Sequence, residues 1–298
     1  MNIVIAGGSG FIGEALARKL STENHRVTIL TRNPQKKSSF HALQWDGKTL
    51  GEWSTALDGC DAVINLTGEL LAGRRWSKAQ KDRIISSRVH STKVIVEAIK
   101  NAEHKPHTLI NASGVGYYGD VPSGDVFEDH APGNDFLAQV CAQWEDEARA
   151  AEQSGVRTVM TRLGVVLENG GVALPRLAMP FRLFVGGWIG TGKQWFPWIH
   201  RDDVIGAMIF AIEHTSLSGP VNLTAPQMTT NKEFCRVLGN VLHRPCWAPV
   251  PSFVLKIALG EMAEMLLAGQ RAVPRKLQQH GYTFRFPSAF EALQSIYR

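Results

Sequence analysis

The sequence has no long apolar run and few cysteines, and both shortages limit what the protein can be. No stretch of its 298 residues approaches the roughly 18 consecutive apolar residues of a membrane-spanning helix. Its cysteines are Cys60, Cys141, Cys235 and Cys246, and they form no CxxC pair and match no zinc-ligand spacing. We therefore expect buried thiols in a reducing compartment, no metal site and no membrane contact.

The sequence also lacks the dense basic runs of nucleic-acid-binding proteins. Its net charge is +5, but the basic residues are spread along the chain, and the densest group is only that between Arg74 and Arg83. A surplus of this size favours anionic small ligands such as phosphates over nucleic acid. The first residues contain no basic segment followed by a long apolar one, so we expect a cytoplasmic protein without a signal peptide.

The first half of the chain alternates short apolar runs with helical patterns. Strands are expected at 2–6, 26–30, 41–45, 62–66, 108–112 and 157–166, and helices at 11–20, 79–100 and 136–152. This alternation is typical of a parallel sheet covered by helices on both faces. The prediction is an α/β fold, a Rossmann-type doubly wound parallel sheet, formed by residues 1–167.

The second half has a different composition. Residues 170–200 are rich in glycine, proline and tryptophan and show little regular periodicity. Beyond them we expect helices at 203–213, 231–243, 251–268 and 288–297, and a short strand at 220–223. We expect residues 168–298 to form a smaller substrate lobe with a short C-terminal domain, parts of which can return to the main sheet.

A glycine-rich segment, GGSGFIG at residues 7–13, joins the first expected strand to the first expected helix. In a dinucleotide-binding loop Gly7 would allow the tight turn, Gly10 the approach of a pyrophosphate, and Gly13 the close packing of the helix. Phe11 and Ile12 would open the helix, whose free N–H groups attract phosphate. The alternative is a tight turn that binds no ligand.

The end of the second expected strand bears on the choice of cofactor. NAD-binding proteins usually have an acidic residue there, which binds the ribose hydroxyls. This sequence has Thr31 and Arg32 instead, with Lys36 and Lys37 close behind. An arginine can pair with the 2′-phosphate of NADP(H) through charge-assisted hydrogen bonds. We therefore expect NADP(H), although Arg32 could also be an ordinary exposed loop residue.

Three segments resemble motifs of the extended short-chain dehydrogenase/reductase superfamily. They are GGSGFIG at 7–13, DAVINLTG at 61–68 and WIHRDDV at 198–204. Further segments, among them NLTGE at 65–69, GYYG at 116–119, RLGVVL at 162–167 and GKQW at 192–195, resemble one atypical branch, the epimerase family proteins. The resemblance implies a Rossmann-type NADP(H) binder, with the cofactor contacted by Leu66, Thr67, Gly68 and Arg162.

The catalytic pair of that superfamily, Tyr-x-x-x-Lys on one helix, is missing. Leu137 and Cys141 stand in the two places and cannot carry out acid–base chemistry of that kind. Three residues are candidates to compensate. Ser113 and Tyr118 follow the fifth expected strand and are candidate catalytic residues, with aromatic packing as the alternative for Tyr118. Glu145 could bind a ribose hydroxyl or be an exposed helix residue.

Candidate substrate residues lie in the glycine- and tryptophan-rich part of the second half. They are Lys193, Gln194, Trp195 and His200, with Arg74 and Trp76 expected on the other side of a cleft and a structural role as the alternative for His200. The leading hypothesis is an NADP(H)-dependent oxidoreductase or epimerase of a small carbonyl or sugar-like molecule, acting as a monomer or homodimer. The alternative is a catalytically inactive NADP(H)-binding sensor or interaction protein.

Overall fold

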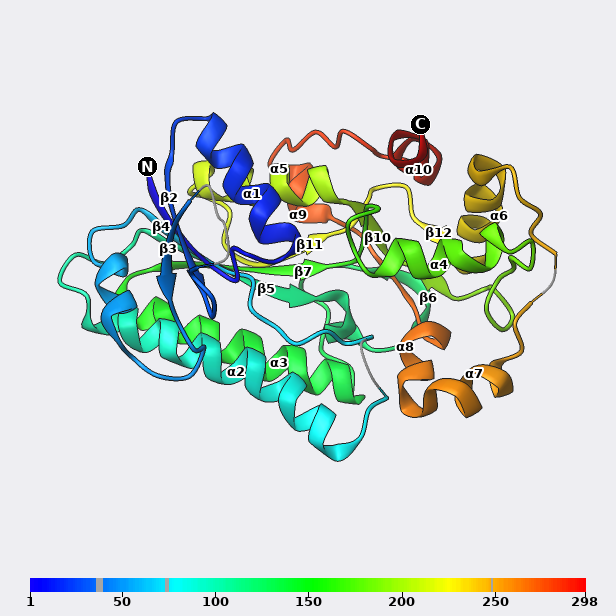
Figure 1. The fold of residues 1–298 in the computed structure, drawn as a ribbon, viewed down its shortest axis with the longest axis horizontal. Coiled ribbons are helices and arrows are strands. Elements are labelled where there is room, and N and C mark those ends of the chain that lie inside the picture. The colour runs from blue at the N-terminus through cyan, green and yellow to red at the C-terminus, as the bar shows by residue number, and fades with distance from the viewer. Residues whose placement is uncertain (36–39, 73–74, 248) are drawn as a thin grey trace.

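The computed structural model describes residues 1–35, 40–72, 75–247 and 249–298, and its centre is one parallel sheet (Figure 1). The seven strands lie in the order β11-β7-β5-β4-β1-β2-β3, and every neighbouring pair is parallel. Their bounds are β1 (Asn2–Ala6), β2 (Arg26–Thr31), β3 (His41–Gln44), β4 (Ala62–Asn65), β5 (Thr108–Gly114), β7 (Arg157–Leu163) and β11 (Gly219–Leu223). The Rossmann-type sheet predicted from the sequence is thus confirmed.

Helices cover both faces of the sheet (Figure 1). On one face lie α1 (Phe11–Thr22) and α5 (Arg201–Glu213), and on the other lie α2 (Lys78–Asn101) and α3 (Phe136–Arg149). Strand β1 shows why both faces are apolar. Ile3 and Ile5 pack in the core beneath α1 and α5, whereas Val4 and Ala6 pack in the core beneath α2. Successive side chains of a strand point to opposite faces, so a continuous apolar run is buried on both sides.

The remaining elements lie outside the main sheet and its four covering helices. Three two-stranded sheets pair β8 (Val165–Leu167) with β10 (Trp198–His200), β9 (Trp195–Phe196) with β12 (Thr229–Thr230), and β6 (Val121–Val126) with β13 (Gln270–Ala272). The helices are α4 (Ala173–Arg182), α6 (Asn231–Leu242), α7 (Ser252–Leu259), α8 (Glu264–Leu267), α9 (Arg275–Gln279) and α10 (Ala289–Tyr297). Short 3-10 turns are η1 (Glu52–Leu57), η2 (Val115–Tyr118), η3 (Ala150–Ser154) and η4 (Gly260–Ala263).

Two expected elements are interrupted at glycines. The strand expected at 157–166 divides at Gly164, where a Cβ atom would lie 2.9 Å from the carbonyl oxygen of Pro197. This close approach lets the chain leave the main sheet and pair as β8 with β10. The helix expected at 251–268 divides at Gly260, whose φ of +63° is incompatible with a continuing α-helix.

Helix α4 was not expected, because residues 170–200 show weak periodicity. It buries Leu174, Ala178 and Phe181, which are spaced by four and three residues on one face. Pro180 lies within the helix and weakens the local signal for it. The burial of this face therefore outweighs the low intrinsic helix propensity of the segment.

The chain returns to the main sheet after residue 200. Helix α5 packs beside α1, and β11 extends the sheet next to β7 (Figure 1). The buried carboxylate of Asp203 accepts hydrogen bonds from the backbone N–H groups of Arg285 and Phe286, at 2.7 Å and 3.0 Å. These contacts hold the C-terminal segment against α5. Among the described residues, no helix combines the length and apolar character that crossing a bilayer requires.

Candidate functional site

The glycine-rich loop after β1 forms a cradle with an open helix N-terminus. Gly7 has a φ of +77°, and the N–H of Gly10 donates to its carbonyl oxygen at 2.9 Å. A Cβ on Gly13 would lie 2.5 Å from that same oxygen, so only glycine allows α1 to pack this close to the loop. No described side chain caps α1 at Gly10. The first N–H groups of the helix thus point outward with the positive end of its dipole.

Two further segments meet this cradle at the carboxyl ends of neighbouring strands. The Gly7 N–H donates to Leu30 at the end of β2, and the Leu66 N–H donates to Ala6, at 3.2 Å and 2.9 Å. The Ser9 and Thr31 hydroxyls lie 3.0 Å apart. The strand order reverses between β1 and β4, and open α/β sheets bind ligands in the crevice at such a point.

The fold brings most of the predicted cofactor residues together at this cradle. Gly7, Gly10, Phe11, Ile12 and Gly13 follow β1, Thr31 and Arg32 lie at the end of β2, and Leu66, Thr67 and Gly68 follow β4. Arg32 is exposed, whereas Lys36 and Lys37 lie outside the described residues. The contact of these residues with a cofactor stays a prediction.

A buried polar network holds the segment after β4 in place. The Asn65 side chain donates to Thr92 and Asn111, at 2.8 Å and 2.7 Å, and its carbonyl oxygen accepts from the Thr67 hydroxyl. Thr67 in turn lies 2.7 Å from the Ser91 hydroxyl of α2. The backbone at Thr67 is thus fixed by side chains from two strands and a helix.

Arg88 of α2 was not assigned a role from the sequence. Its guanidinium donates to the carbonyl oxygens of Glu69 and Ile84, at 3.0 Å and 3.2 Å, and lies 5.2 Å from the Trp144 ring centre. A Cβ on Gly68 would be only 3.0 Å from the Arg88 Cζ atom. Burial lowers the pKa of Arg88, but an arginine keeps its charge at neutral pH. A cation thus stands at the carboxyl end of β4.

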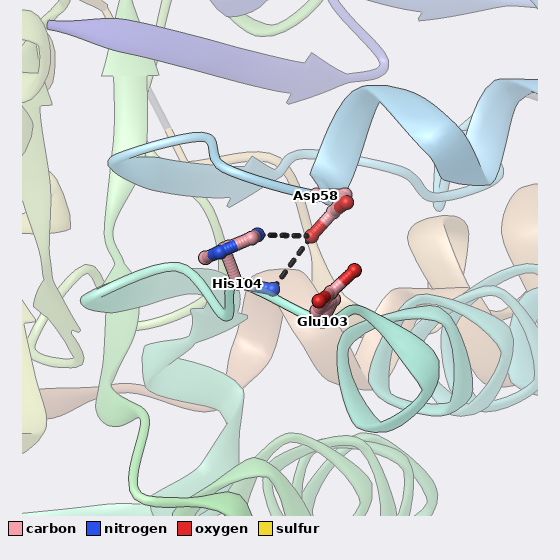
Figure 2. Close-up of side chains that lie close together, drawn as sticks. All are labelled: Asp58, Glu103 and His104. Atoms are coloured by element: carbon pink, nitrogen blue, oxygen red, sulfur yellow. Dashed lines mark hydrogen bonds and ion pairs between the residues drawn. The ribbon is translucent and has the colours of Figure 1, made fainter.

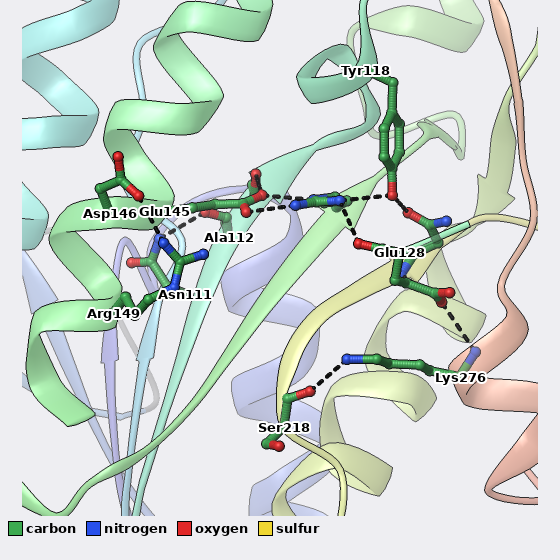
Figure 3. A network of polar contacts seen from close by, with 12 residues as sticks. Asn111, Ala112, Tyr118, Glu128, Glu145, Asp146, Arg149, Ser218 and Lys276 are labelled. Atoms are coloured by element: carbon green, nitrogen blue, oxygen red, sulfur yellow. Dashed lines mark hydrogen bonds and ion pairs between the residues drawn. The ribbon is translucent and has the colours of Figure 1, made fainter. Parts of the chain in front are cut away.

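Glu145 and Arg162 form the centre of a second buried network, which Figure 3 shows. Arg162 of β7 donates from Nε and Nη2 to the two carboxylate oxygens of Glu145, both at 2.8 Å. The Ser113 hydroxyl donates to the same carboxylate at 2.7 Å. Burial by itself lowers the pKa of Arg162, but its hydrogen bonds and charge interaction with Glu145 outweigh that effect and raise the pKa. The network links β5, β7 and α3.

Tyr118 completes this network on its far side. Its hydroxyl accepts from Arg162 Nη1 at 2.9 Å and donates to the Asn222 side chain at 2.6 Å (Figure 3). Burial raises the pKa of Tyr118 to about 12. The ring of Tyr117 lies against the Arg162 guanidinium, 3.5 Å from Cζ to the ring centre. Both tyrosines are therefore packing partners of a buried arginine.

These contacts define the surroundings of four predicted site residues. Ser113, Glu145 and Arg162 are buried with their polar atoms bound to one another, and Tyr118 is bound to Arg162. Glu145 is 0% exposed, so the reading of it as an exposed helix residue is wrong. Each of these four side chains therefore makes structural contacts within the protein. Their roles in catalysis or cofactor binding stay predictions.

A cavity of about 360 Å³ lies at the carboxyl ends of β5 and β7. Gly114 and Leu163, the last residues of these strands, form part of its wall. Other walls come from α3, from residues 189–197 and from residues 264–270. Because β1, β4, β5 and β7 run parallel, the cavity and the glycine cradle lie at the same carboxyl edge of the sheet.

Leu137 and Cys141 both line this cavity. These are the positions at which the resemblance places the catalytic tyrosine and lysine, so that face of the cavity has neither group. The Cys141 side chain is buried, and burial raises the pKa of its thiol to about 11. The thiol is therefore neutral near pH 7, and Cys141 is a poor nucleophile or base there.

The fold places only two of the four candidate substrate residues in the cavity lining. Gln194 and Trp195 line the cavity, whereas Lys193 is exposed and lies outside its lining. His200 is buried beyond the lining, where its Nδ1 accepts from the Asp202 N–H at 3.1 Å and caps α5. The structure thus supports the structural reading of His200. Trp76 also lines the cavity, and Arg74 lies outside the described residues.

Asp58, Glu103 and His104 form an exposed cluster of potential metal-binding side chains (Figure 2). The His104 N–H donates to the Asp58 carboxylate at 2.6 Å, which ties together the turns that precede β4 and β5. The cluster therefore lies at the amino ends of these strands, away from the cradle and the cavity. We assign it no function.

Comparison with known proteins agrees with this geometry. Residues 3–223 match the NAD dependent epimerase/dehydratase family, and residues 250–296 match a domain of unknown function, DUF1731. Among curated relatives, Epimerase family protein SDR39U1 homolog, chloroplastic, from Arabidopsis thaliana is 40% identical over 99% of this chain and 86% of its own. Epimerase family protein YfhF from Bacillus subtilis is 39% identical over 99% of this chain and 98% of its own.

Solved structures show the same fold over the whole chain. Human epimerase family protein SDR39U1 with NADPH has a TM-score of 0.90 at 35% identity and covers 100% of this chain and 99% of its own. UDP-glucuronic acid 4-epimerase from Bacillus cereus has a TM-score of 0.80 at 19% identity, covering 100% of this chain and 98% of its own, and shows the fold alone. This chain belongs to the NAD dependent epimerase/dehydratase family, in its atypical SDR39U1-like branch of epimerase family proteins.

Proposed function

We propose that this protein binds NADP(H) and acts as an oxidoreductase or epimerase on a small carbonyl compound. One observation carries the proposal: the uncapped glycine cradle and the cavity lie at the same carboxyl edge of one parallel sheet. A dinucleotide bound along that edge would have its phosphates at α1 and its reactive ring toward β5 and β7.

The described residues fit a dinucleotide. A Cβ on Gly10 would lie 3.1 Å from the Gly7 carbonyl oxygen and would cover the N-terminus of α1. Gly10 itself is exposed, so the backbone there is open to a phosphate group. Arg88 adds a cation beside Gly68, one strand away. These features supply N–H donors and positive charge for a phosphate group.

The preference for NADP(H) over NAD(H) rests on Arg32. It follows β2 directly and is exposed, in the place where an acidic residue would bind the ribose hydroxyls of NAD. A guanidinium there attracts a 2′-phosphate, which an acidic residue would repel. The human relative at 35% identity was solved with NADPH, which supports the same choice.

When bound, the nicotinamide would give or take a hydride. The chain's own part is to hold the ring and the substrate in contact and to exclude water from the cavity. Gln194 and Trp195 are the candidate substrate contacts from the second half of the chain. With Leu137 and Cys141 in the usual catalytic positions, a proton would have to come from water or from the candidate catalytic residues Ser113 and Tyr118.

A second function, cofactor binding without catalysis, is favoured by that same absence. A sensor or interaction protein needs the cradle and Arg32 but no acid–base pair. Such a protein would bind NADPH and leave carbonyl compounds unreduced. The subcellular compartment and the choice between monomer and homodimer stay predictions under either function.

The test is calorimetric titration of ligand-free protein with NADP⁺, NADPH, NAD⁺ and NADH, followed by assays of NADPH oxidation with carbonyl compounds. Tight binding of NADP⁺ and NADPH with weak binding of NAD⁺ and NADH, together with turnover of a carbonyl compound, is the expected result. Binding of NADP⁺ and NADPH without turnover of any carbonyl compound in the assays would favour the sensor. Failure to bind any dinucleotide would refute both functions.

A further inference from the structure

We propose that the cavity binds an uncharged, largely apolar carbonyl compound and not a sugar nucleotide. This inference rests on the proposed oxidoreductase function, because it names the class of substrate for the same site. Three properties of the cavity support it. These are the negative sign of its charged side chains, the hydrogen bonds that its side-chain amides already make, and its small, mostly apolar interior.

The charged side chains that the structure describes along the cavity are acidic. Among the described lining residues the only charged ones are Asp135 and Glu264. A sugar nucleotide carries two phosphate groups, which proteins bind with arginine, lysine or uncapped helix N-termini. Asp135 also caps α3, one of the helices that line the cavity, since its Oδ1 accepts from the Ala138 N–H at 2.9 Å. The described part of the cavity wall therefore presents two carboxylates, and no cation, to a diphosphate.

The three side-chain amides of the lining already form hydrogen bonds within the protein. Gln194 donates to the carbonyl oxygens of Ile189 and Leu266, at 3.2 Å and 3.1 Å. Gln270 donates to the Val115 carbonyl oxygen, and Asn231 accepts from the Ile189 N–H at 2.8 Å. These bonds hold the cavity walls together. A sugar hydroxyl could use the same atoms only by displacing these bonds, which costs free energy.

Most of the remaining lining is apolar and is supplied by several helices and strands. Leu137 belongs to α3, Leu163 to β7, Leu177 to α4, and Met265 to α8. An apolar ligand gains free energy in proportion to the apolar surface that it buries here. At about 360 Å³ the cavity is near the lower end of the range for small-molecule sites, roughly 300–1,000 Å³. A compact apolar molecule fits this size.

Straight-chain methyl ketones, each one methylene longer than the last from hexanone to decanone, provide a direct test. Their binding is measured by calorimetry on the full chain, without NADPH and at saturating NADPH. The dissociation constant should fall roughly fourfold for each methylene until the cavity is full. UDP-glucose should neither bind nor displace the ketones. Tight UDP-glucose binding, or affinity that does not change with chain length, would overturn the inference.

Two cavity variants and a matched surface control localise the binding. Leu177→Gln and Leu71→Gln each place an amide in the lining, and each should weaken ketone binding about tenfold. Leu183→Gln makes the same change just past α4, where the side chain is 62% exposed, and should leave ketone binding unaltered. Equal effects from all three would also overturn the inference.

NADPH titration separates this inference from the proposed function. The cavity residues Leu177 and Leu71 are distinct from the predicted cofactor residues, so their variants should keep wild-type NADPH affinity, which also reports correct folding. Ketones that bind without any NADPH binding would refute the proposed function and leave the apolar site standing. NADPH binding together with UDP-glucose binding in the cavity would refute the apolar site and leave the proposed function standing.

Discussion

Arg162 and Glu145 form an ion pair between β7 and α3 whose side chains are only 2% and 1% exposed. The removal of one member of such a pair strands a charge in the interior. We expect Arg162→Met to lower the free energy of unfolding by about 3–5 kcal/mol, measured by urea denaturation. Arg149→Met is the control, because its pair with Asp146 is 46% and 72% exposed and contributes less than about 1 kcal/mol. Similar losses for both variants would contradict the buried-pair interpretation.

Gly13 is expected to tolerate no side chain. The Cβ of Gly13→Ala would meet the Gly7 carbonyl oxygen at 2.5 Å and the Gly8 Cα at 2.7 Å, both backbone atoms that cannot move aside cheaply. We expect NADPH affinity to fall at least ~10-fold as the cradle distorts, measured by calorimetry. Gly51→Ala is the matched control, since its Cβ would have ordinary contacts at 3.5 Å. Unchanged affinity in Gly13→Ala would show that the cradle does not hold the cofactor.

Arg32 should decide the cofactor preference. We expect Arg32→Asp to weaken NADPH binding by roughly 10- to 100-fold, because a charge-assisted bond to the 2′-phosphate becomes a repulsion. NADH binding should change little, since NADH lacks that phosphate. Arg26→Asp makes the same charge change on an exposed residue at the other end of β2 and should affect neither cofactor. Equal losses for NADPH and NADH in Arg32→Asp would disprove the assignment.

His200 should make stability fall in mild acid. Burial lowers the pKa of His200 below its ordinary value of 6.5, so the unfolded chain binds a proton at a pH where the folded protein does not. The free energy of unfolding should therefore decrease as pH falls below about 6.5 and level off below the folded-state pKa. His200→Asn keeps a good helix cap and should show a shallower decrease.

Denaturation curves between pH 8 and pH 5.5, a range that spans the ordinary histidine pKa of about 6.5, provide the measurement. His214→Asn, which changes an exposed histidine, should retain the wild-type pH dependence. If wild-type protein and His200→Asn lose stability in parallel, another group is responsible.

The sequence alone was sufficient to predict the sheet, the glycine cradle and the family. Apolar runs such as Ile3–Ala6, and glycines beside a strand end, are local patterns whose physical requirements do not depend on distant residues. The positions of Leu137 and Cys141, too, were enough to show that the usual catalytic pair is missing.

The tertiary structure alone determined what surrounds the candidate site residues. Glu145 and Arg162 are separated by 17 residues, and only the packing of α3 against the sheet turns a polar helix residue into half of a buried ion pair. Helix α4 forms because its apolar face is covered by other elements. Its prolines weaken the local sequence signal for a helix. The charge and polarity of the cavity likewise depend on segments more than a hundred residues apart, whose contacts local pattern cannot encode.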